Sequence, residues 1–470
     1  MIFKSIFKRR KKADIICYAP YNNLLIDQQG QFKICCHNNS YILGTYPNEK
    51  PLEIWFSKKR KEIIKTFELG EISDSCKSCI NEQKHLRYSE NKKYFLENKI
   101  KNGFKNFPMR VEYMLSNICN LNCIMCSENI SNSSTNPHSI IGNQSIDFDD
   151  DFIQNMEEIF KKSKISIFSG GEPFAIPIYY KIWDRLHEVN SKSNIYIQTN
   201  ATIINDKVKS TIKKHKMQIG VSIDSIDKDI YEIIRKNANY EETFSNLEFF
   251  INHSKKINST LSIMLTPMKI NALGITDVLK FCNKKEIYLS YSILEFPPKL
   301  AIWAMSSTEI DEIIQNLDKY KFQANRSEVI KRNEENFHQL KELIKTYHKN
   351  KLFFEKNNNN IENEILQKGK IFKEEYKNSI SNHIKAPQQR VDIESKLEKI
   401  LHKSLELFSN KFSNPLFIYA YFANFGIEVI INHLLQFEEE SLINFIDQKT
   451  DDLKFLLDSK SYNRIIDIAI

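Results

Sequence analysis

Short apolar runs alternate with longer amphipathic segments through the middle third of the chain, from about Phe107 onward. The short runs are rich in β-branched and aromatic residues, as strands are, and the longer segments show the three-to-four-residue apolar spacing of helices. The predicted strands are Met109–Leu115, Lys164–Phe168, Asn194–Gln198, Met217–Ser222, Thr260–Leu265 and Ile287–Ile293. The predicted helices between them are Asp151–Lys162, Ile178–Val189, Asn205–His215, Tyr240–Lys256 and Ile275–Cys282. Alternation of this kind predicts an α/β fold with parallel strands.

The six strand–helix units predict an open, partial (β/α)6 barrel of the TIM type, in which chemistry gathers at the carboxyl ends of the strands. Ahead of this barrel, a small cysteine-rich module contains the alternating segments Leu24–Asp27 and Gln31–Ile34, which predict a β-hairpin around Gly30. After the barrel, the chain reads as mostly helical. We therefore expect three domains, at residues 1–105, 106–300 and 301–470.

The last third of the chain has a helical pattern throughout. Ser306 and Glu309 have the spacing of a capping box at a helix start, and the polar run Asn357–Asn360 predicts a loop or linker. The helices expected here are Asp311–Lys321, Ser327–Lys349, Ile361–Asn382, Asp392–Leu407, Asn414–Leu435 and Glu439–Leu457. No catalytic constellation stands out, so this region is expected to cover the barrel mouth, bind a macromolecular substrate or mediate assembly.

Composition narrows the classes of function. The 470 residues carry a formal net charge of +8 and are 41% hydrophobic, as in ordinary globular proteins. No run approaches about 18 uncharged apolar residues, so we expect no membrane span. The basic start, Met1–Lys12, is not followed by an apolar stretch of adequate length, which disfavours a secretory signal and favours a cytoplasmic location. The modest charge and the lack of interleaved aromatic and basic residues disfavour nucleic-acid binding.

Nine cysteines are present, and all but Cys282 fall into two sets, a pattern that fits metal ligation in a reducing compartment better than disulfides. The later set, Cys119, Cys123 and Cys126, has the spacing C-x3-C-x2-C directly after the first predicted barrel strand. Three thiolates are one fewer than a closed tetrahedral site needs, and they suit an iron–sulfur cubane whose fourth iron stays free. The alternative is a zinc knuckle completed by a distant residue, although zinc motifs favour C-x2-C pairs.

This cysteine triad, with its C-N-L-x-C wording, resembles the hallmark of the radical S-adenosylmethionine (radical SAM) enzymes. Met125 stands where the family usually has an aromatic residue, and it keeps the position apolar. The resemblance implies a [4Fe–4S] cluster on Cys119, Cys123 and Cys126 whose open iron binds S-adenosylmethionine. It also implies reductive cleavage of that cofactor to a 5′-deoxyadenosyl radical, which takes a hydrogen atom from a substrate.

Further segments at predicted strand ends resemble the same family. Gly170-Gly171-Glu172-Pro173 is similar to the G-G-E-P run that holds the amino group of the cofactor, which implies that role for Gly170, Gly171 and Glu172. By itself such a run would more often be a simple turn. The run Gln198–Thr202 is similar to the T-N-G-T segment of the family, with alanine in place of glycine at position 201.

The fourth strand ends in Val221-Ser222-Ile223-Asp224, which resembles the V-S-I-D segment of the family, and Arg235 follows. The resemblance implies that Ser222, Asp224 and Arg235 lie at the cofactor, with Ser222 near its ribose or carboxylate. Arg235 suits the carboxylate because a guanidinium binds carboxylates bidentately. An equal alternative is that Asp224 and Arg235 simply pair with each other.

The earlier cysteine set precedes the barrel. Cys17, Gly30 and Cys35 have the spacing C-x12-G-x4-C, which resembles the opening of SPASM and twitch domains. The resemblance implies an auxiliary [4Fe–4S] cluster held by four residues, Cys17, Cys35, Cys76 and Cys79. Four cysteines with a C-x2-C pair would also serve a structural zinc ion. The role of Cys36 stays open between an alternative ligand, a reactive thiol and a bystander.

Together these features predict a radical SAM enzyme whose auxiliary cluster accepts an electron from the substrate radical, so that the net change is an oxidation. The implied electron donor is a ferredoxin or flavodoxin, and no catalytic residue is identified beyond the cluster ligands. A peptide or protein substrate is favoured, and dehydrogenation of a sugar or cyclitol alcohol is the alternative. A non-catalytic iron–sulfur scaffold that binds a partner is an alternative from another class of function.

Overall fold

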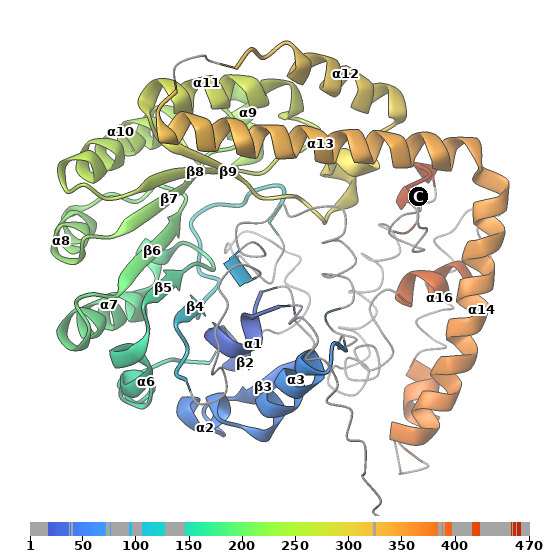
Figure 1. Cartoon of the computed structure of the whole chain (residues 1–470), viewed down its shortest axis with the longest axis horizontal. Coiled ribbons are helices and arrows are strands. Elements are labelled where there is room, and N and C mark those ends of the chain that lie inside the picture. The colour runs from blue at the N-terminus through green and yellow to red at the C-terminus, as the bar shows by residue number, and fades with distance from the viewer. Residues whose placement is uncertain are drawn as a thin grey trace, which may run out of the picture. The chain divides into compact units, whose positions relative to one another are not determined.

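The computed structural model describes residues 17–36, 38, 41–71, 76, 94–95, 106–126, 146–322, 326–383, 388, 391–396, 416–423, 453, 455–456 and 458–461. The chain forms two compact units. The first comprises Met1–Ser116, Ser145–Ser169 and Pro177–Tyr196, and the second comprises Asn117–Gln144, Gly170–Ile176 and Ile197–Ile470. Figure 1 labels their helices and strands.

The first unit is built on a mixed sheet with the strand order β3-β2-β1-β4-β5. Its strands are β1 (Asn23–Asp27), β2 (Gln31–Lys33), β3 (Ile42–Thr45), β4 (Arg110–Met114) and β5 (Ile165–Phe168). Strands β1 and β2 form an antiparallel hairpin, which confirms the predicted one, and Gly30 occupies its turn with φ +71°. Strand β1 also pairs in parallel with β4, and β4 pairs in parallel with β5. The hairpin of the cysteine-rich module therefore continues the parallel sheet, which the sequence did not predict.

Helices of the first unit are α1 (Ala19–Asn22), α2 (Pro51–Trp55), α3 (Lys58–Glu68), α6 (Asp150–Lys162) and α7 (Pro177–Val189). Arg60 of α3 is fully buried and lies over the Trp55 ring, 3.4 Å from its centroid. Its Nε donates to the carbonyl of Pro20 at 2.9 Å and its Nη1 to that of Trp55 at 3.0 Å. This buried guanidinium joins α1, α2 and α3 because its donors are satisfied by backbone carbonyls.

Strand β6 (Asn194–Thr199) begins in the first unit and ends in the second, where the strand order continues β6-β7-β8-β9. Strands β7 (Gln218–Ser222), β8 (Leu261–Leu265) and β9 (Tyr288–Tyr291) pair in parallel. The connecting helices are α8 (Asp206–His215), α9 (Lys228–Ile234), α10 (Tyr240–Lys256) and α11 (Ile275–Lys285). The side chains of Asn205, Asp227 and Asn239 cap the first three of these helices. The α/β class with its parallel-sheet core is confirmed, and the domain boundaries stay a prediction.

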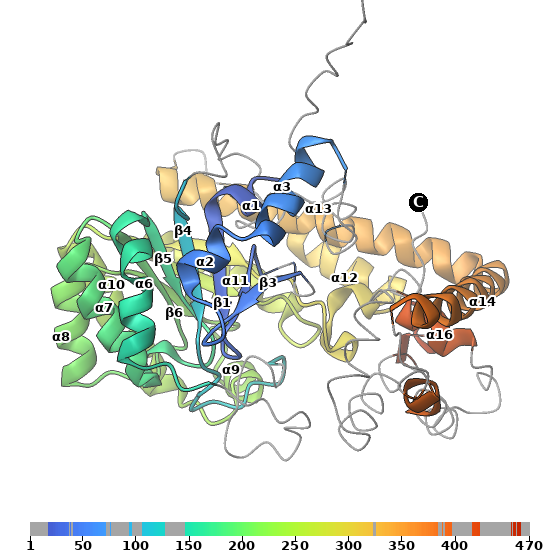
Figure 2. The same ribbon diagram turned by 90° about the horizontal axis from the view of Figure 1, so that it is seen from below.

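The C-terminal part of the second unit is helical, as predicted: α12 (Ser307–Asp318), α13 (Glu328–Lys356), α14 (Asn358–His383) and α16 (Leu416–Phe422). Ser306 and Glu309 form the predicted capping box at the start of α12. The prediction of a loop at Asn357–Asn360 was wrong, because Asn357 alone interrupts the helices and α14 begins at the next residue. The Asn357 amide bonds to the Phe353 carbonyl at 2.8 Å, so a single residue makes the sharp turn between α13 and α14 (Figures 1 and 2).

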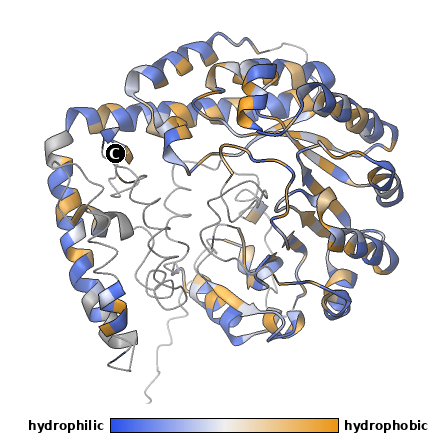
Figure 3. Cartoon of the chain, turned by 180° about the vertical axis from the view of Figure 1, so that it is seen from behind, coloured by the Kyte–Doolittle hydropathy of each residue, from blue (hydrophilic) through white to orange (hydrophobic). Residues whose placement is uncertain are grey.

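Apolar and polar residues alternate along α13 and α14 (Figure 3). The apolar face of α14, formed by Ile361, Ile365, Phe372 and Tyr376, is buried in what we name the C-terminal apolar cluster. Its other members are Ile234, Met268, Leu294, Ala301, Trp303, Ala304, Phe354, Ile393, Phe417, Tyr419, Ala420, Leu453 and Leu456. Of the helices predicted after residue 390, the structure describes residues 392–396, 416–423, 453 and 455–456, and the remainder lies outside the described residues. No helix in the described part of the chain is long and apolar enough to cross a membrane.

Candidate active site

The cysteine loop, residues 117–126, follows β4 and is fixed by backbone hydrogen bonds on two sides. The amide of Glu172 donates to the carbonyl of Ile118 at 2.7 Å. On the other side, the amides of Asn122 and Ile124 donate to the carbonyls of Lys236 and Ile234, each at 3.0 Å. These last two bonds lie on either side of Cys123 in the loop. In the facing segment they lie on either side of Arg235. Cys119 and Cys123 lie between these fixed points and Cys126 lies two residues beyond the last of them, and all three cysteines are partly exposed.

Two side chains from other segments of the second unit donate hydrogen bonds to thiols of this loop. Asn200, which follows β6, places its Nδ2 3.8 Å from the Sγ of Cys119. Arg235, which follows α9, places its Nη1 3.9 Å from the Sγ of Cys123. Burial raises the pKa of the Cys123 thiol, and the positive charge of Arg235 opposes that shift.

The Gly-Gly turn after β5 packs directly on the cysteine loop. Gly170 and Gly171 have φ of +79° and +50°, a region that side-chain-bearing residues rarely adopt. A Cβ added to Gly171 would lie 2.1 Å from the carbonyl oxygen of Ile118. Glycine is therefore required at position 171 both for the backbone angle and for the close approach of this turn to the loop.

Glu172 is fully buried, and its carboxylate accepts three hydrogen bonds from the protein. The donors are the Thr199 hydroxyl at 2.6 Å, the Asn200 amide at 2.7 Å and the Phe174 amide at 3.2 Å. Burial raises the pKa of Glu172 to about 6, and these donors offset part of the shift. The carboxylate thus links the end of β5 to the end of β6. A role of Glu172 in holding the cofactor stays a prediction.

Asp224 and Arg235, whose relation the sequence left open, form a buried ion pair at 2.8 Å. Asp224 is 1% exposed and Arg235 6% exposed. The second carboxylate oxygen of Asp224 accepts from the Thr266 amide at 2.8 Å. Burial alone lowers the pKa of Arg235, but Asp224 and the Cys123 thiol outweigh it, so the net shift is upward and the guanidinium stays charged. The pair holds a fixed positive charge beside Cys123.

Ser222 ends β7, and its hydroxyl accepts a hydrogen bond from Gln198 Nε2 at 2.8 Å. Gln198 lies on β6, so this bond joins neighbouring strand ends. The hydroxyl keeps its own proton to donate, which fits the predicted contact of Ser222 with the cofactor. That contact stays a prediction.

The sequence reading missed a polar network around Asn200. Its Nδ2 also donates to Asn120 Oδ1 at 3.0 Å, and its Oδ1 accepts from the Thr202 amide at 2.9 Å. The amide of Asn120 in turn donates to the Thr202 hydroxyl at 2.7 Å. The T-N-A-T run was the available signal, because hydrogen-bonding residues at a strand end suggest a site even where their partners are unknown.

The donor chemistry of the loop fits an iron–sulfur cluster. No three His, Cys, Asp or Glu side chains within the described residues converge as ligands of one metal ion. Each cysteine of a cubane binds a different iron, however, so its three thiolates need not converge on a single point. Three soft, partly exposed sulfur atoms on one clamped loop, with a cation beside them, match the ligands that such clusters use.

Among the earlier cysteines, Cys35 and Cys76 are buried, whereas Cys17 and Cys36 are partly exposed. The Sγ of Cys76 accepts from Asn38 Nδ2 at 3.1 Å, and the Sγ of Cys17 accepts from the Ala19 amide at 3.4 Å. Cys79, the fourth predicted ligand, lies outside the described residues.

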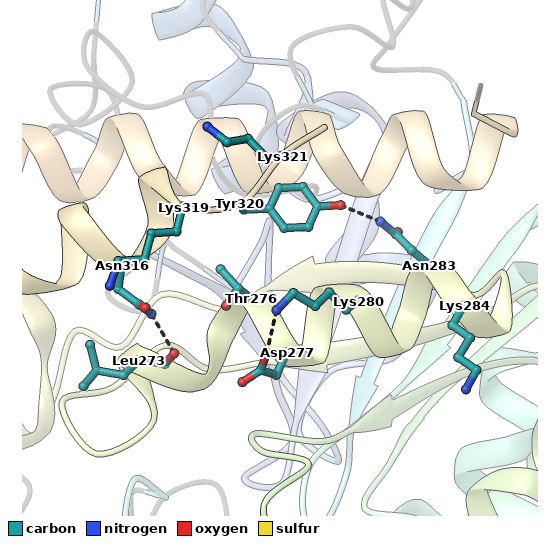
Figure 4. A pocket seen from close by; sticks show the side chains of 10 residues that line it. All are labelled: Leu273, Thr276, Asp277, Lys280, Asn283, Lys284, Asn316, Lys319, Tyr320 and Lys321. Atoms are coloured by element: carbon teal, nitrogen blue, oxygen red, sulfur yellow. Dashed lines mark hydrogen bonds and ion pairs between the residues drawn. The ribbon is translucent and has the colours of Figure 1, made fainter. Parts of the chain in front are cut away.

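A cavity of about 630 Å³ lies elsewhere in the second unit, between α11 and the segment after α12 (Figure 4). Its lining includes four lysines, and it contains none of the predicted site residues. Tyr320 points across it to Asn283, whose Nδ2 donates to the tyrosine hydroxyl at 3.0 Å, and Lys280 is paired with Asp277 at 3.0 Å. The lining residues are Leu273, Thr276, Asp277, Lys280, Asn283, Lys284, Asn316, Lys319, Tyr320 and Lys321.

Comparison with protein families matches the site to a known architecture. The model of the radical SAM superfamily matches residues 113–271, which include the cysteine loop, the Gly-Gly turn and Arg235. This is a radical SAM domain. An iron–sulfur cluster-binding domain, SPASM, matches residues 17–80, ahead of the radical SAM domain as predicted. The two domains imply a [4Fe–4S] cluster, an auxiliary cluster and S-adenosylmethionine as cofactors.

Individual proteins similar to this chain match only part of it. GTP 3′,8-cyclase of Clostridium botulinum is 28% identical over 195 residues, which are 40% of this chain and 52% of the cyclase. A cysteine-type anaerobic sulfatase-maturating enzyme of Clostridium perfringens is 27% identical over 126 residues, 25% of this chain and 33% of that enzyme. The chain thus spans about half, or less, of the length of these relatives. The solved structure of anSMEcpe with bound AdoMet is 19% identical, with a TM-score of 0.35 over 44% of this chain and 58% of that one.

Proposed function

We propose that this protein is a radical SAM enzyme that oxidatively modifies a peptide or protein. The observation that carries the proposal is the clamped loop that presents the thiols of Cys119, Cys123 and Cys126 between the Gly-Gly turn and Arg235. When bound, the cluster supplies one electron to S-adenosylmethionine, whose cleavage yields methionine and a 5′-deoxyadenosyl radical that takes a hydrogen atom from the substrate.

Different residues of the chain hold the cluster and bind the cofactor. Cys119, Cys123 and Cys126 hold the cluster, and the turn at Gly170 and Gly171 brings backbone polar groups against the loop, where they bind the amino group of the cofactor. Ser222 donates its free proton to the ribose or carboxylate of the cofactor. Glu172 after β5, Asp224 after β7 and Arg235 after α9 are buried and supply charge to the same unit.

The SPASM domain supplies the oxidising half of the reaction. We assign its cluster to Cys17, Cys35, Cys76 and Cys79, a closed set of four thiolates that exchanges electrons and binds no substrate. When bound there, the cluster would supply an acceptor for the electron that the substrate loses after hydrogen-atom removal, so that the net change would be a two-electron oxidation of the substrate. A ferredoxin or flavodoxin in the cytoplasm supplies the low-potential electron that starts each turnover.

A peptide or protein substrate is supported by the match to the sulfatase-maturating enzyme, whose name denotes a protein as its substrate. The match to the cyclase covers 52% of that enzyme and 40% of this chain, and the match to the sulfatase-maturating enzyme covers 33% of that enzyme and 25% of this chain. Because both matches are partial, neither carries a substrate over to this chain by itself, and the peptide or protein substrate is part of the proposal.

Anaerobic formation of 5′-deoxyadenosine from S-adenosylmethionine, driven by dithionite, tests the proposal. The iron-reconstituted wild type should form it, and the Cys119/Cys123/Cys126→Ala variant should not. Cys282→Ala is the matched control, because Cys282 is a fully buried core residue of α11 and should leave both iron content and product unchanged. Absence of 5′-deoxyadenosine from fully iron-loaded wild type, with candidate peptides present and absent, would refute the proposed reaction.

A further inference from the structure

Arg235 is held in one orientation beside the Cys123 sulfur. The backbone bonds from Asn122 and Ile124 fix Cys123 opposite Arg235, and Asp224 fixes the far side of the guanidinium at 2.8 Å. Asp224 is itself held by the Thr266 amide. With Nη2 on Asp224 and Nη1 3.9 Å from Cys123 Sγ, the guanidinium bridges a buried carboxylate and a cluster ligand. Its planar, rigid set of donors suits such a bridge.

Asn200 is held just as firmly beside the Cys119 sulfur. Its backbone amide donates to Glu172, and its side-chain Oδ1 accepts from both the amide and the hydroxyl of Thr202, at 2.9 and 2.7 Å. Because two donors face the oxygen, the other end of the side-chain amide must be the NH2 group. That group faces Asn120 Oδ1 and Cys119 Sγ. Asn200 is 7% exposed, so water competes little for these bonds.

We propose that Asn200 and Arg235 are hydrogen-bond donors to the cluster thiolates and raise the reduction potential of the S-adenosylmethionine-binding cluster. The inference rests on the proposed function, in which Cys119 and Cys123 ligate that cluster. Reduction adds one negative charge, part of which resides on the ligating sulfurs. A donor or a cation at the sulfur stabilises the reduced form more than the oxidised form, and hydrogen bonds to sulfur are a known determinant of cluster potential. The two residues are thus positioning and tuning groups that act through the ligands.

Two substitutions separate this role from a purely structural one. Asn200→Asp keeps the backbone bond to Glu172 and an oxygen for Thr202, and it replaces the donor at Cys119 with an acceptor. Asn200→Ala removes the same donor without adding charge. For the second site, Asp224→Asn with Arg235→Gln removes the cation together with its counter-charge, because Arg235→Gln alone would leave a buried carboxylate unpaired.

The control is Asn246→Asp. Asn246 lies on α10 and donates its Nδ2 to the Ala201 carbonyl at 3.0 Å, so the same chemical change is made near the end of β6 without touching a sulfur.

The experiment is a redox titration followed by electron paramagnetic resonance on the full-length protein with both clusters reconstituted. The signal that changes on adding S-adenosylmethionine identifies the relevant cluster. We expect Asn200→Asp to lower the one-electron reduction equilibrium constant about tenfold, a shift of about 59 mV to more negative potential. Asn200→Ala and the Asp224/Arg235 double variant should shift it in the same direction, and Asn246→Asp should leave it within about twofold of wild type.

Unchanged potentials in all three sulfur-site variants, measured on a cluster that loads normally, would overturn this inference and leave the proposed function intact. A wild-type protein that binds no cluster at Cys119, Cys123 and Cys126 would overturn both. A shift that Asn246→Asp reproduces in full would also overturn the inference, because it would assign the effect to charge rather than to the contact with sulfur.

Discussion

The two cysteine sets differ in how the chain supplies them. In the first unit, Cys17, Cys35 and Cys76 come from separate segments; Cys35 and Cys76 are only 7% and 8% exposed, and Cys17 is partly exposed. In the second unit, three cysteines come from one loop between positions 119 and 126, and all are partly exposed. The comparison teaches that three ligands from one loop depend on how that loop is held, whereas ligands from separate segments depend on the packing of the whole module.

The charges around the two sets differ as well. The sulfurs of Cys17 and Cys76 accept from a backbone amide and from the neutral amide of Asn38. The sulfur of Cys123 instead faces the guanidinium of Arg235. Because a cation stabilises added negative charge, the guanidinium supports the uptake of an electron at the Cys123 sulfur. The experiments below test this contrast, beginning with the largest expected effect.

Removing ligands should separate the two sets completely. The Cys119/Cys123/Cys126→Ala variant should lose all 5′-deoxyadenosine formation and one cluster of iron per chain. Cys17→Ala should keep 5′-deoxyadenosine formation and lose the modified product, because it disturbs only the auxiliary cluster. Iron and sulfide analysis with chromatographic product assays would measure both. Normal product from Cys17→Ala would remove the auxiliary cluster from the reaction.

Gly171→Ala should dislodge the cysteine loop. The left-handed backbone alone costs about 1–3 kcal/mol for a non-glycine residue, and the new Cβ would overlap the Ile118 carbonyl. Thermal unfolding and iron content should both fall. Gly274→Ala is the matched control, because its φ is −90° and no atom lies within 4 Å of the added Cβ. Equal behaviour of the two variants would show that the Gly-Gly turn does not clamp the loop.

Glu172→Gln should remove the pH dependence that the buried carboxylate gives to stability, and it replaces an acceptor for one of the three donors by an amide NH2. The folded pKa of Glu172 is raised from 4.5 to about 6, so the folded state binds the proton more tightly than the unfolded state. The wild type should therefore lose about 1.3 kcal/mol of stability as the pH rises from 4.5 to 6, out of about 2 kcal/mol over the whole titration.

Denaturant titrations of both proteins at several pH values would measure that loss. The glutamine variant lacks the titrating group, so its stability should be flat in this window apart from contributions common to both proteins. A wild-type minus variant difference that does not change between pH 4.5 and 6 would contradict the buried, hydrogen-bonded state of the Glu172 carboxylate.

Asn38→Asp should have the smallest effect. It keeps the oxygen that accepts from the Tyr41 amide and removes the donor at Cys76 Sγ. The reduction equilibrium constant of the auxiliary cluster should fall about threefold, while the rate of 5′-deoxyadenosine formation stays at the wild-type value. A redox titration that found the change in the other cluster would reverse the assignment of the two cysteine sets.

The local features of the fold were largely predictable from the sequence. All six predicted strands of the middle third are present, because each is a short apolar run between amphipathic helices. The capping box at Ser306 was also predictable, since it depends on residues three positions apart. The break at Asn357–Asn360 was misplaced because four consecutive asparagines suggest a loop, although all but the first fit a helical turn.

The candidate site was predictable as a set of motifs but not as a set of contacts. The bonds from Asn200 to Cys119 and from Arg235 to Cys123 join residues 81 and 112 positions apart. Spacing along the chain cannot show such partners, so the choice between an Asp224–Arg235 pair and two separate cofactor contacts had to stay open. The surroundings of Glu172 could not be read from the sequence for the same reason, because two of its three donors, Thr199 and Asn200, lie at the end of another strand.

The two residues between Cys123 and Cys126 also contact an apolar cluster that is formed by other segments of the chain. Ile124 and Met125 pack against the C-terminal apolar cluster, to which α14 and α16 contribute. A ligand that binds the cysteine loop more tightly when this cluster is packed would also stabilise the packed state of the cluster, and by reciprocity the packed cluster would strengthen the binding. Substitutions in the apolar face of α14, far along the chain from the cysteine motif, therefore offer a way to look for such coupling.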